Sequence, residues 1–375
     1  MAGGGAAAAR PGTWTWEGEG VKVCKECGVP EGITRNHLWT NDGRLLTRDG
    51  KQRLVVVERD FLARIFDTLG EDLAGRAFEL LREAKAYDAK SYVQSLGGRS
   101  IALARRIYWL RRRVITELAD FMSVLGLAKL EVLEYRRDGT ARFRCYGCYQ
   151  REFLLGDILG GYLVLHGHPF RHRIEEGEGC FDILIQPSPG EEDPTLRFDY
   201  QPEEPLEGYI SYKLCNRCGA PFPVSFFKWD TAEGTVMDTR TGRNVVFIDV
   251  MGINLAISEM IREDSCGMGG RLEEMLAVNT KEVVDSIIPM LQWKHRRPEE
   301  RVRDLFFMAF RGMGNPIFTE PHEGGVRVRV ENPFNYPLAA GITASFIARG
   351  RPCGFTWRKE SPGRLEVTVR FDGEG

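Results

Sequence analysis

Two cysteine pairs with the same spacing and the same neighbours are the strongest chemical signal in the sequence. Cys24 and Cys27 form one pair and Cys215 and Cys218 form the other, and both pairs read Lys-x-Cys-x-x-Cys-Gly-x-Pro. Two thiolates at this spacing can hold one side of a tetrahedral ion, and a closed structural zinc site needs four ligands. We therefore expect both pairs to bind one structural Zn²⁺.

A third Cys-x-x-Cys pair, Cys145 and Cys148, leaves an alternative open. It could complete a zinc site with Cys24 and Cys27 inside the first half of the chain, which would leave the pair in the second half without partners. Thiols that bind no metal are a further interpretation. A redox role is less favoured for the repeated pairs, because they precede hairpins, whereas a redox pair at a helix start has a lowered thiol pKa.

A cluster of histidines near one more cysteine is a weaker metal candidate. His166, His168 and His172 precede Cys180, and imidazoles with a thiolate can bind a metal. The matching stretch of the second half is the basic turn Arg349–Pro352. A basic turn in both places favours a solvated loop.

The likeness between the two cysteine segments continues far beyond them, at an offset of about 191 residues, from Cys24 to Cys215. Trp39 then falls opposite Trp229, and a β-branched run at 55–58 falls opposite one at 245–249. Solenoid repeats have periods of about 20–50 residues, so a repeat of this length indicates a duplicated domain. A residue present in both copies should serve something that both copies do.

The elements that must position these cysteines follow the same order in each half. A knuckle and a hairpin come first, then a helical part, then antiparallel strands with a short helix, which together predict an α/β (α+β) fold of two tandem pseudo-symmetric copies. The first copy should hold helices near 61–73, 77–86 and 100–125 and a short helix at 154–164. The predicted organisation is a flexible tail at 1–20, repeat one at 21–186, a linker at 187–209 rich in Pro, Gly, Asp and Glu, and repeat two at 210–375.

The composition limits the possible function classes. The formal net charge of −2 argues against a strongly electrostatic nucleic-acid binder, and no apolar run is long enough to span a bilayer. Six of the nine cysteines form local pairs, which is typical of metal knuckles or redox pairs in a reducing cytoplasm. A basic run, more often a solvated face than a docking site, comprises Arg105, Arg106, Arg111, Arg112 and Arg113, with an echo at Lys294, His295, Arg296 and Arg297.

Several segments resemble the 4-vinyl-reductase-type, or hydrocarbon-binding, domain. They are Arg53–Val56, Gly156–Gly161 and Glu178–Ile183 in the first copy, and Asn332–Phe334, Ala339–Ile342 and Leu365–Val367 in the second. The resemblance extends to sensor domains of phenol- and toluene-responsive bacterial activators and, more distantly, to small vesicle-tethering subunits. It implies an α/β fold, often dimeric, that encloses an apolar pocket for a hydrophobic small molecule. Relatives that bind metal near the last strands use several cysteines there, whereas this chain keeps only Cys180.

The resulting expectation is a cytoplasmic, prokaryotic, zinc-stabilised sensor or binding protein that holds a hydrophobic or amphipathic small molecule. The sequence favours a non-enzyme, because it has no recognisable catalytic or cofactor motif. It should be a monomeric pseudo-dimer or a homodimer, with a possible protein partner. The expected pocket residues are Phe66, Leu69, Trp109, Phe121, Phe306, Phe310 and Phe346. The alternatives are a zinc-knuckle adapter for a protein or RNA partner, and a thiol-dependent redox accessory protein that uses Cys145 and Cys148.

Overall fold

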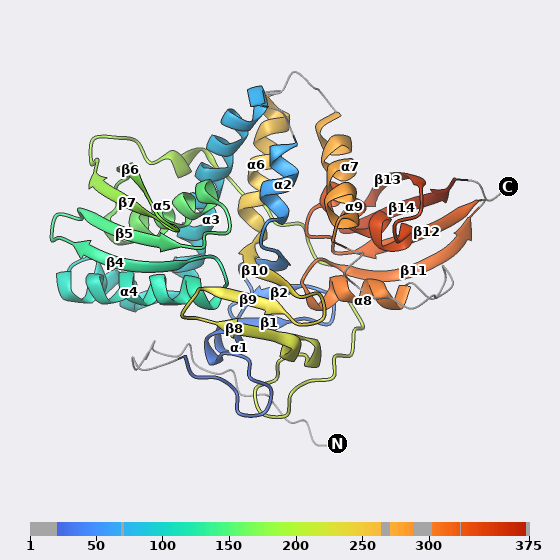
Figure 1. Ribbon diagram of the computed structural model, residues 1–375, viewed down its shortest axis with the longest axis horizontal. Coiled ribbons are helices and arrows are strands. Elements are labelled where there is room, and N and C mark those ends of the chain that lie inside the picture. Colours follow the sequence, from blue (N-terminus) through green and yellow to red (C-terminus); the bar gives the residue numbers. More distant parts are fainter. Residues whose placement is uncertain (1–20, 69–70, 264–270, 288–301, 323, 373–375) are drawn as a thin grey trace.

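The structure is a computed structural model that describes residues 21–68, 71–263, 271–287, 302–322 and 324–372 (Figure 1). It has an α+β fold with three antiparallel sheets. In Figure 1 a central sheet lies low in the middle, and one smaller sheet with its helices lies on each side of it. The predicted tail at 1–20 lies outside the described residues.

The first half contains five helices and seven strands among the described residues. The helices are α1 (Glu31–Asn36), α2 (Phe61–Asp67), α3 (Glu71–Ala104), α4 (Tyr108–Val124) and α5 (Arg151–His166). The strands are β1 (His37–Trp39), β2 (Leu45–Thr47), β3 (Arg53–Glu58), β4 (Lys129–Tyr135), β5 (Ala141–Tyr146), β6 (Phe170–Gly177) and β7 (Cys180–Pro187).

The second half presents its elements in a matching order. The 3₁₀ helix η1 (Pro194–Arg197) lies in the connection between the halves. The 3₁₀ helix η2 (Phe222–Phe226) then precedes the α-helices α6 (Val250–Glu263), α7 (Arg271–Asp285), α8 (Val302–Phe310) and α9 (Tyr336–Ala348). The strands are β8 (Phe227–Asp230), β9 (Thr235–Asp238), β10 (Arg243–Asp249), β11 (Asn315–His322), β12 (Gly325–Glu331), β13 (Cys353–Ser361) and β14 (Arg364–Phe371).

The central sheet is built from both halves. Its strand order is β1-β2-β3-β10-β9-β8, and β3 pairs with β10 in antiparallel register at the middle, with Val56 opposite Phe247. The strands on both sides of this junction are β-branched and buried, as expected for strands covered on two faces. The two predicted copies therefore share one sheet.

The flanking sheets have equivalent topologies. Their orders are β4-β5-β7-β6 in the first half and β11-β12-β14-β13 in the second. In each case the glycine-containing helix, α5 or α9, connects the second and third strands of the chain order and is capped by a side chain at its start, Gln150 or Asn335. The repeated order agrees with the predicted duplication, which remains a prediction about the origin of the chain.

Each hairpin packs on the flanking unit of the opposite half. The indole N–H of Trp39 donates to the carbonyl of Phe310 at 2.8 Å, and the indole N–H of Trp229 donates to the carbonyl of Val124 at 3.0 Å. The helices follow the same pattern, because α3 packs against α6 and α7 packs against α2 (Figure 1). The halves are thus interlocked, and each completes the core of the other.

The helical part differs from the sequence-based expectation. Instead of a helix near 77–86 and another at 100–125, α3 extends from Glu71 to Ala104 and α4 begins only at Tyr108. Ile107 has an extended backbone (φ −120°, ψ 112°) and separates the two helices. Because α3 packs against α5 on one side and against α6 on another, it does not have a single apolar stripe. The length of a helix is predicted from such a stripe, so the sequence pattern did not show how far α3 extends.

The predicted linker at 187–209 contains ordered contacts. It includes η1, where Thr195 is buried and the ammonium of Lys90 on α3 contacts Asp193 at 2.8 Å. Further along, Glu203 hydrogen-bonds Tyr336 at 2.5 Å. This segment therefore packs along the body of the protein as it connects the two halves.

Candidate metal centre

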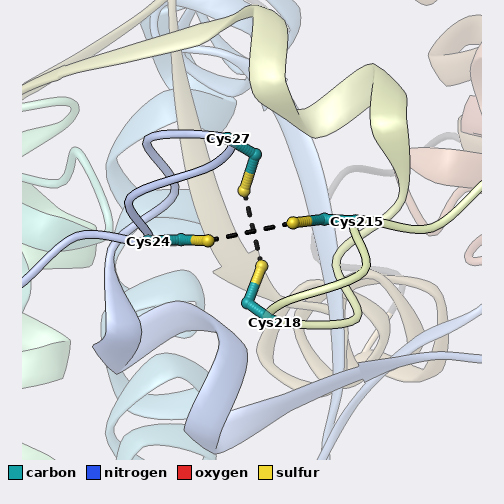
Figure 2. A group of neighbouring side chains, drawn as sticks. All are labelled: Cys24, Cys27, Cys215 and Cys218. Atoms are coloured by element: carbon teal, nitrogen blue, oxygen red, sulfur yellow. Dashed lines mark hydrogen bonds between the residues drawn. The ribbon is translucent and has the colours of Figure 1, made fainter.

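Four sulfur atoms meet at the point where the two cysteine knuckles face each other (Figure 2). The Sγ atoms of Cys24, Cys27, Cys215 and Cys218 all lie within 4.8 Å of one another. Cys24 and Cys215 are 3.8 Å apart, and Cys27 and Cys218 are 3.4 Å apart. Among the described residues, this is the group of His, Cys, Asp and Glu side chains that is close enough to hold a metal ion.

The spacing fits a tetrahedral ion and excludes disulfides in this state. A zinc–sulfur bond of about 2.3 Å in a tetrahedron gives sulfur–sulfur edges of roughly 3.8 Å, which is close to both distances above. A disulfide needs sulfurs about 2.05 Å apart, and all four cysteines are free. The prediction that the two repeated pairs come together is confirmed, and the site needs no ligand from Cys145 or Cys148.

The first knuckle is a tight turn held by its own backbone. The N–H of Cys24 donates to the carbonyl of Val29, and the N–H of Gly28 donates to the carbonyl of Cys24, both at 2.8 Å. Val23 and Pro30 close the turn as an antiparallel bridge. Gly28 has φ +75°, a left-handed conformation in which a side chain is strained, so the glycine after the second cysteine is a geometric requirement.

The second knuckle repeats these contacts. The N–H of Cys215 donates to the carbonyl of Ala220 at 2.8 Å, and the N–H of Gly219 donates to the carbonyl of Cys215 at 2.9 Å. Leu214 and Pro221 form the matching bridge, and Gly219 has φ +73°. Two turns of the same geometry thus present their sulfurs from opposite sides.

Within the cluster, the pKa values of the cysteines shift in opposite directions. Burial opposes ionisation of Cys24, but hydrogen bonds from the backbone of Cys27 and Glu26 lower its pKa to about 7. Burial raises the pKa of Cys27 and of Cys218, and the sulfurs of Cys24 and Cys215 add to the effect. Burial thus resists ionisation of Cys27 and Cys218, and a bound cation would favour their thiolate forms.

The remaining Cys-x-x-Cys pair lies in a different place. Cys145 is fully buried near the end of β5, and Cys148 is half-buried in the turn that leads into α5. A hydrogen bond with Cys148, followed by burial, raises the pKa of Cys145. The guanidinium of Arg59 interacts electrostatically with both sulfurs.

The predicted histidine site is occupied by protein contacts. The Nε2 atom of His166 hydrogen-bonds the hydroxyl of Tyr135 at 2.8 Å, and its ring stacks on Tyr162 with centroids 4.1 Å apart. Burial lowers the pKa of His166 to about 3. His168 hydrogen-bonds a backbone carbonyl through Nδ1, and His172 is exposed on β6. Neither these histidines nor Cys180 belong to the described metal-ligand group.

The predicted pocket residues do not converge on one place. Phe66 packs edge-on against Phe153 and Phe121 stacks near His37, whereas Phe310 and Phe346 both contact Phe307 in the other half. The two remaining described residues lie at the surface: Trp109 is 64 % exposed and Phe306 is 39 % exposed. Leu69 lies outside the described residues. The pocket composition stays a prediction.

The basic run begins in the turn between α3 and α4 and continues into α4, and three of its arginines contact neighbouring groups. Arg105 donates to the carbonyl of Val164, Arg111 donates to the carbonyl of Arg137, and Arg113 pairs with Glu117 at 2.8 Å. The echo at 294–297 lies outside the described residues. These contacts favour a structural role for three of the five arginines.

Sequence reasoning missed a buried ionic cluster next to the central sheet. The ammonium of Lys85 lies 3.2 Å from Asp88, 3.3 Å from Asp157 and 3.4 Å from Asp249, which joins α3, α5 and β10. Burial opposes the charge of Lys85, but the three carboxylates outweigh it and raise its pKa. In the sequence, Lys85 and Asp88 look like an ordinary surface pair on a helix, so no local signal marks them.

Comparison of the chain with protein-family models, with curated proteins and with solved structures gave no match. The resemblance to hydrocarbon-binding domains therefore stays a hypothesis. No helix within the described part of the chain is long and apolar enough to cross a membrane.

Proposed function

We propose that the protein is a zinc-stabilised binding protein in which one Zn²⁺ staples the two halves together. The observation that carries this proposal is the four-sulfur cluster, because two of its members come from each half. Four soft thiolate ligands in tetrahedral arrangement are typical of structural zinc or of iron–sulfur centres. With all four positions taken by protein, no position is left for a substrate or water, so the ion would act through stability.

Metal content and thermal unfolding test the zinc staple. Purified protein should contain one zinc per chain by elemental analysis and should show no visible absorption of the kind an iron–thiolate centre gives. Removal by a chelator, or the Cys215→Ser substitution, should lower the unfolding midpoint by several degrees, because the free energy of metal binding contributes to folding. Cys353→Ser is the control, since Cys353 lies outside the cluster, and it should keep the zinc. Iron in place of zinc, or four free thiols in a protein of unchanged stability, would refute the proposal.

The second part of the proposal is the ligand, a hydrophobic or amphipathic small molecule held by the flanking units. Support for it comes from the resemblance of 156–161 and 178–183 to hydrocarbon-binding domains, and from the largely apolar, buried side chains of α5 and α9 in the two flanking units. The eight described free cysteines agree with a reducing compartment, and we propose a cytoplasmic protein.

Native mass spectrometry of freshly purified protein tests the ligand. We expect a population heavier than the zinc-bound chain by the mass of one or two small organic molecules, which organic extraction removes and releases for identification. The same spectra give the oligomeric state. A chain that carries zinc alone, and that gains no thermal stability from fatty acids or aromatic hydrocarbons, would leave the staple intact and refute the ligand.

A further inference from the structure

The third Cys-x-x-Cys pair, Cys145 and Cys148, lies outside the metal centre and exists in only one half of the protein. Cys145 is the fifth residue of the six-residue strand β5, and its side chain is fully buried, whereas Cys148 is half-buried. Gly147, with φ +53°, turns the chain between them, and α5 begins three residues after Cys148. Both thiols are free. Cys148 is therefore the more accessible of the two residues, and Cys145 is enclosed.

The only described cation next to both sulfurs without a carboxylate partner is Arg59. Its guanidinium lies against the turn, because a Cβ on Gly147 would be 3.4 Å from its Nη2 atom. That Nη2 atom has one long contact, to the carbonyl of Leu127 at 3.5 Å, and the buried Nε atom has no hydrogen-bond partner. The positive charge of Arg59 acts electrostatically on both sulfurs. Such a neighbour stabilises a thiolate.

The second half has no counterpart of Arg59, Cys145 or Cys148. Val250 stands where Arg59 is, because each directly follows the last residue of its central strand, Glu58 or Asp249. Val330 and Pro333 stand at the places of the two cysteines, because Val330 and Cys145 are each the last but one residue of their strand. Val330 pairs with Leu365 in its sheet as Cys145 pairs with Phe181. The strand, turn and helix are built without the cysteines there, so the fold itself does not require them.

We propose that Cys145 and Cys148 form a thiol–disulfide exchange site that reacts with low-molecular-weight disulfides. The thiolate of Cys148 attacks one sulfur of the disulfide RSSR, which gives a mixed disulfide with Cys148 and releases RS⁻. Cys145 then loses its proton and attacks the Cys148 sulfur, which closes the intramolecular disulfide and releases a second RS⁻. The dithiol is oxidised by two electrons, RSSR is reduced to two thiols, and excess thiol reverses the reaction.

Equilibration of the full-length, zinc-loaded chain in buffers of reduced and oxidised glutathione tests this site. After trapping with an alkylating agent, peptide mass spectrometry should show the 145–148 disulfide at ratios at which Cys180 and Cys353 are still alkylated. The zinc-to-protein ratio should stay constant through the same range. This second readout separates the exchange site from the metal centre, so failure of one does not imply failure of the other.

Substitutions assign the roles. Cys148→Ser should leave Cys145 reduced, because the attacking sulfur is missing, and Cys145→Ser should stop at the mixed disulfide of Cys148 with glutathione. Arg59→Gln should slow the first step about threefold, because loss of a neighbouring cation lowers the fraction of thiolate while the remaining thiolate becomes more nucleophilic. Arg59→Lys should retain most of the rate. Arg64→Gln is the matched control, because Arg64 is a surface arginine paired with Asp60, and it should change nothing.

Three results would overturn the proposal. The first is that Cys145 and Cys148 stay reduced at every glutathione ratio that leaves the zinc in place. The second is that the Cys148→Ser variant oxidises as readily as the parent. The third is a second equivalent of metal, bound to these two sulfurs, in the purified protein. These three results are measured on the parent protein and on Cys148→Ser. A folding defect in the Cys145→Ser variant would therefore not affect the test.

Discussion

Gly28 and Gly219 give the knuckles their shape through backbone conformation alone. Both have φ near +75°, and a Cβ on either would meet nothing within 4 Å. We therefore expect Gly28→Ala and Gly219→Ala each to cost about 1–2 kcal/mol of unfolding free energy, because an L-residue is strained in the left-handed region. Both variants should also bind zinc more weakly.

Thermal unfolding and zinc competition with a chelator measure these effects. Gly354→Ala is the control, because a Cβ there also meets nothing within 4 Å while its φ lies outside the left-handed region. Knuckle variants that match this control would contradict the role of backbone strain.

At the residue scale, the sequence was sufficient to predict the four cysteine ligands, but it was not sufficient to predict the buried charged residues. The cysteines are recognisable because zinc coordination demands one residue type at one spacing, and the repetition of the motif supplied the other two ligands. Arg311 offered no such signal. It is fully buried, and its partners, Glu58 and Asp238, are 253 and 73 residues away in the sequence.

At the scale of elements, glycines set how closely the flanking helices approach. A Cβ on Gly160 of α5 would lie 2.4 Å from the carbonyl oxygen of Ala86 on α3, whereas a Cβ on the adjacent Gly161 would meet only Leu118, at 3.9 Å. We expect Gly160→Ala to destabilise the protein by about 1–3 kcal/mol through overpacking. Gly161→Ala should be neutral or stabilising by up to about 1 kcal/mol, since alanine favours the helix.

Chemical denaturation of the two variants checks this contrast within one helix. Gly341→Ala in α9 should behave like Gly160→Ala, because its Cβ would lie 2.3 Å from the carbonyl oxygen of Ala277. Equal stabilities for the Gly160 and Gly161 variants would mean that α3 and α5 can separate at little cost.

The elements themselves were predicted unevenly. The α+β class, the hairpins and the glycine-containing helices are confirmed, because turn residues and short apolar patterns mark them locally. The length of α3 was wrong, since a helix with neighbours on two sides shows no single stripe. The pairing of β3 with β10 could not be read from either strand, because β-branched runs specify burial and leave the partner open.

At the scale of the whole molecule, Arg311 joins the two halves through charge. Its guanidinium lies 2.9 Å from Glu58 of β3 and 2.8 Å from Asp238 of β9. Arg311→Met would remove a positive charge that balances two buried carboxylates. We therefore expect the free energy of unfolding to fall by about 3–5 kcal/mol at pH 7. The exposed pair of Arg35 and Glu31 is the control, and Arg35→Met should cost less than about 1 kcal/mol.

The pH dependence of this loss has a defined sign. Burial opposes ionisation of Asp238, but Arg240 and Arg311 outweigh it and hold its pKa below the usual 3.8. A lowered carboxyl pKa stabilises the fold above pH 3.8, and that stabilisation disappears as the pH falls through the folded-state pKa. The difference between parent and Arg311→Met should therefore shrink as unfolding is measured from pH 7 to below pH 4. A difference that grows on acidification would contradict this assignment.

The interlocked halves predict that neither folds alone. A chain cut between Gln201 and Pro202, both exposed, leaves β3 and β10 on different fragments. Each fragment should aggregate when expressed singly, because an unpaired central strand exposes its hydrogen-bonding edge. Co-expressed fragments should form a one-to-one complex with a single zinc, as size exclusion and elemental analysis can show. Two independently soluble fragments would mean that the shared sheet is not essential.

The separation of the paired ligands also has a consequence for synthesis of the protein. Cys27 and Cys218 are 191 positions apart, so at about 5–20 residues per second the ribosome needs roughly 10–40 s between them. During that interval the nascent chain exposes two of the four metal ligands and the unpaired strand β3. Chaperones or zinc carriers can bind the chain during this time. Folding of this protein is therefore an event that follows translation of the second half.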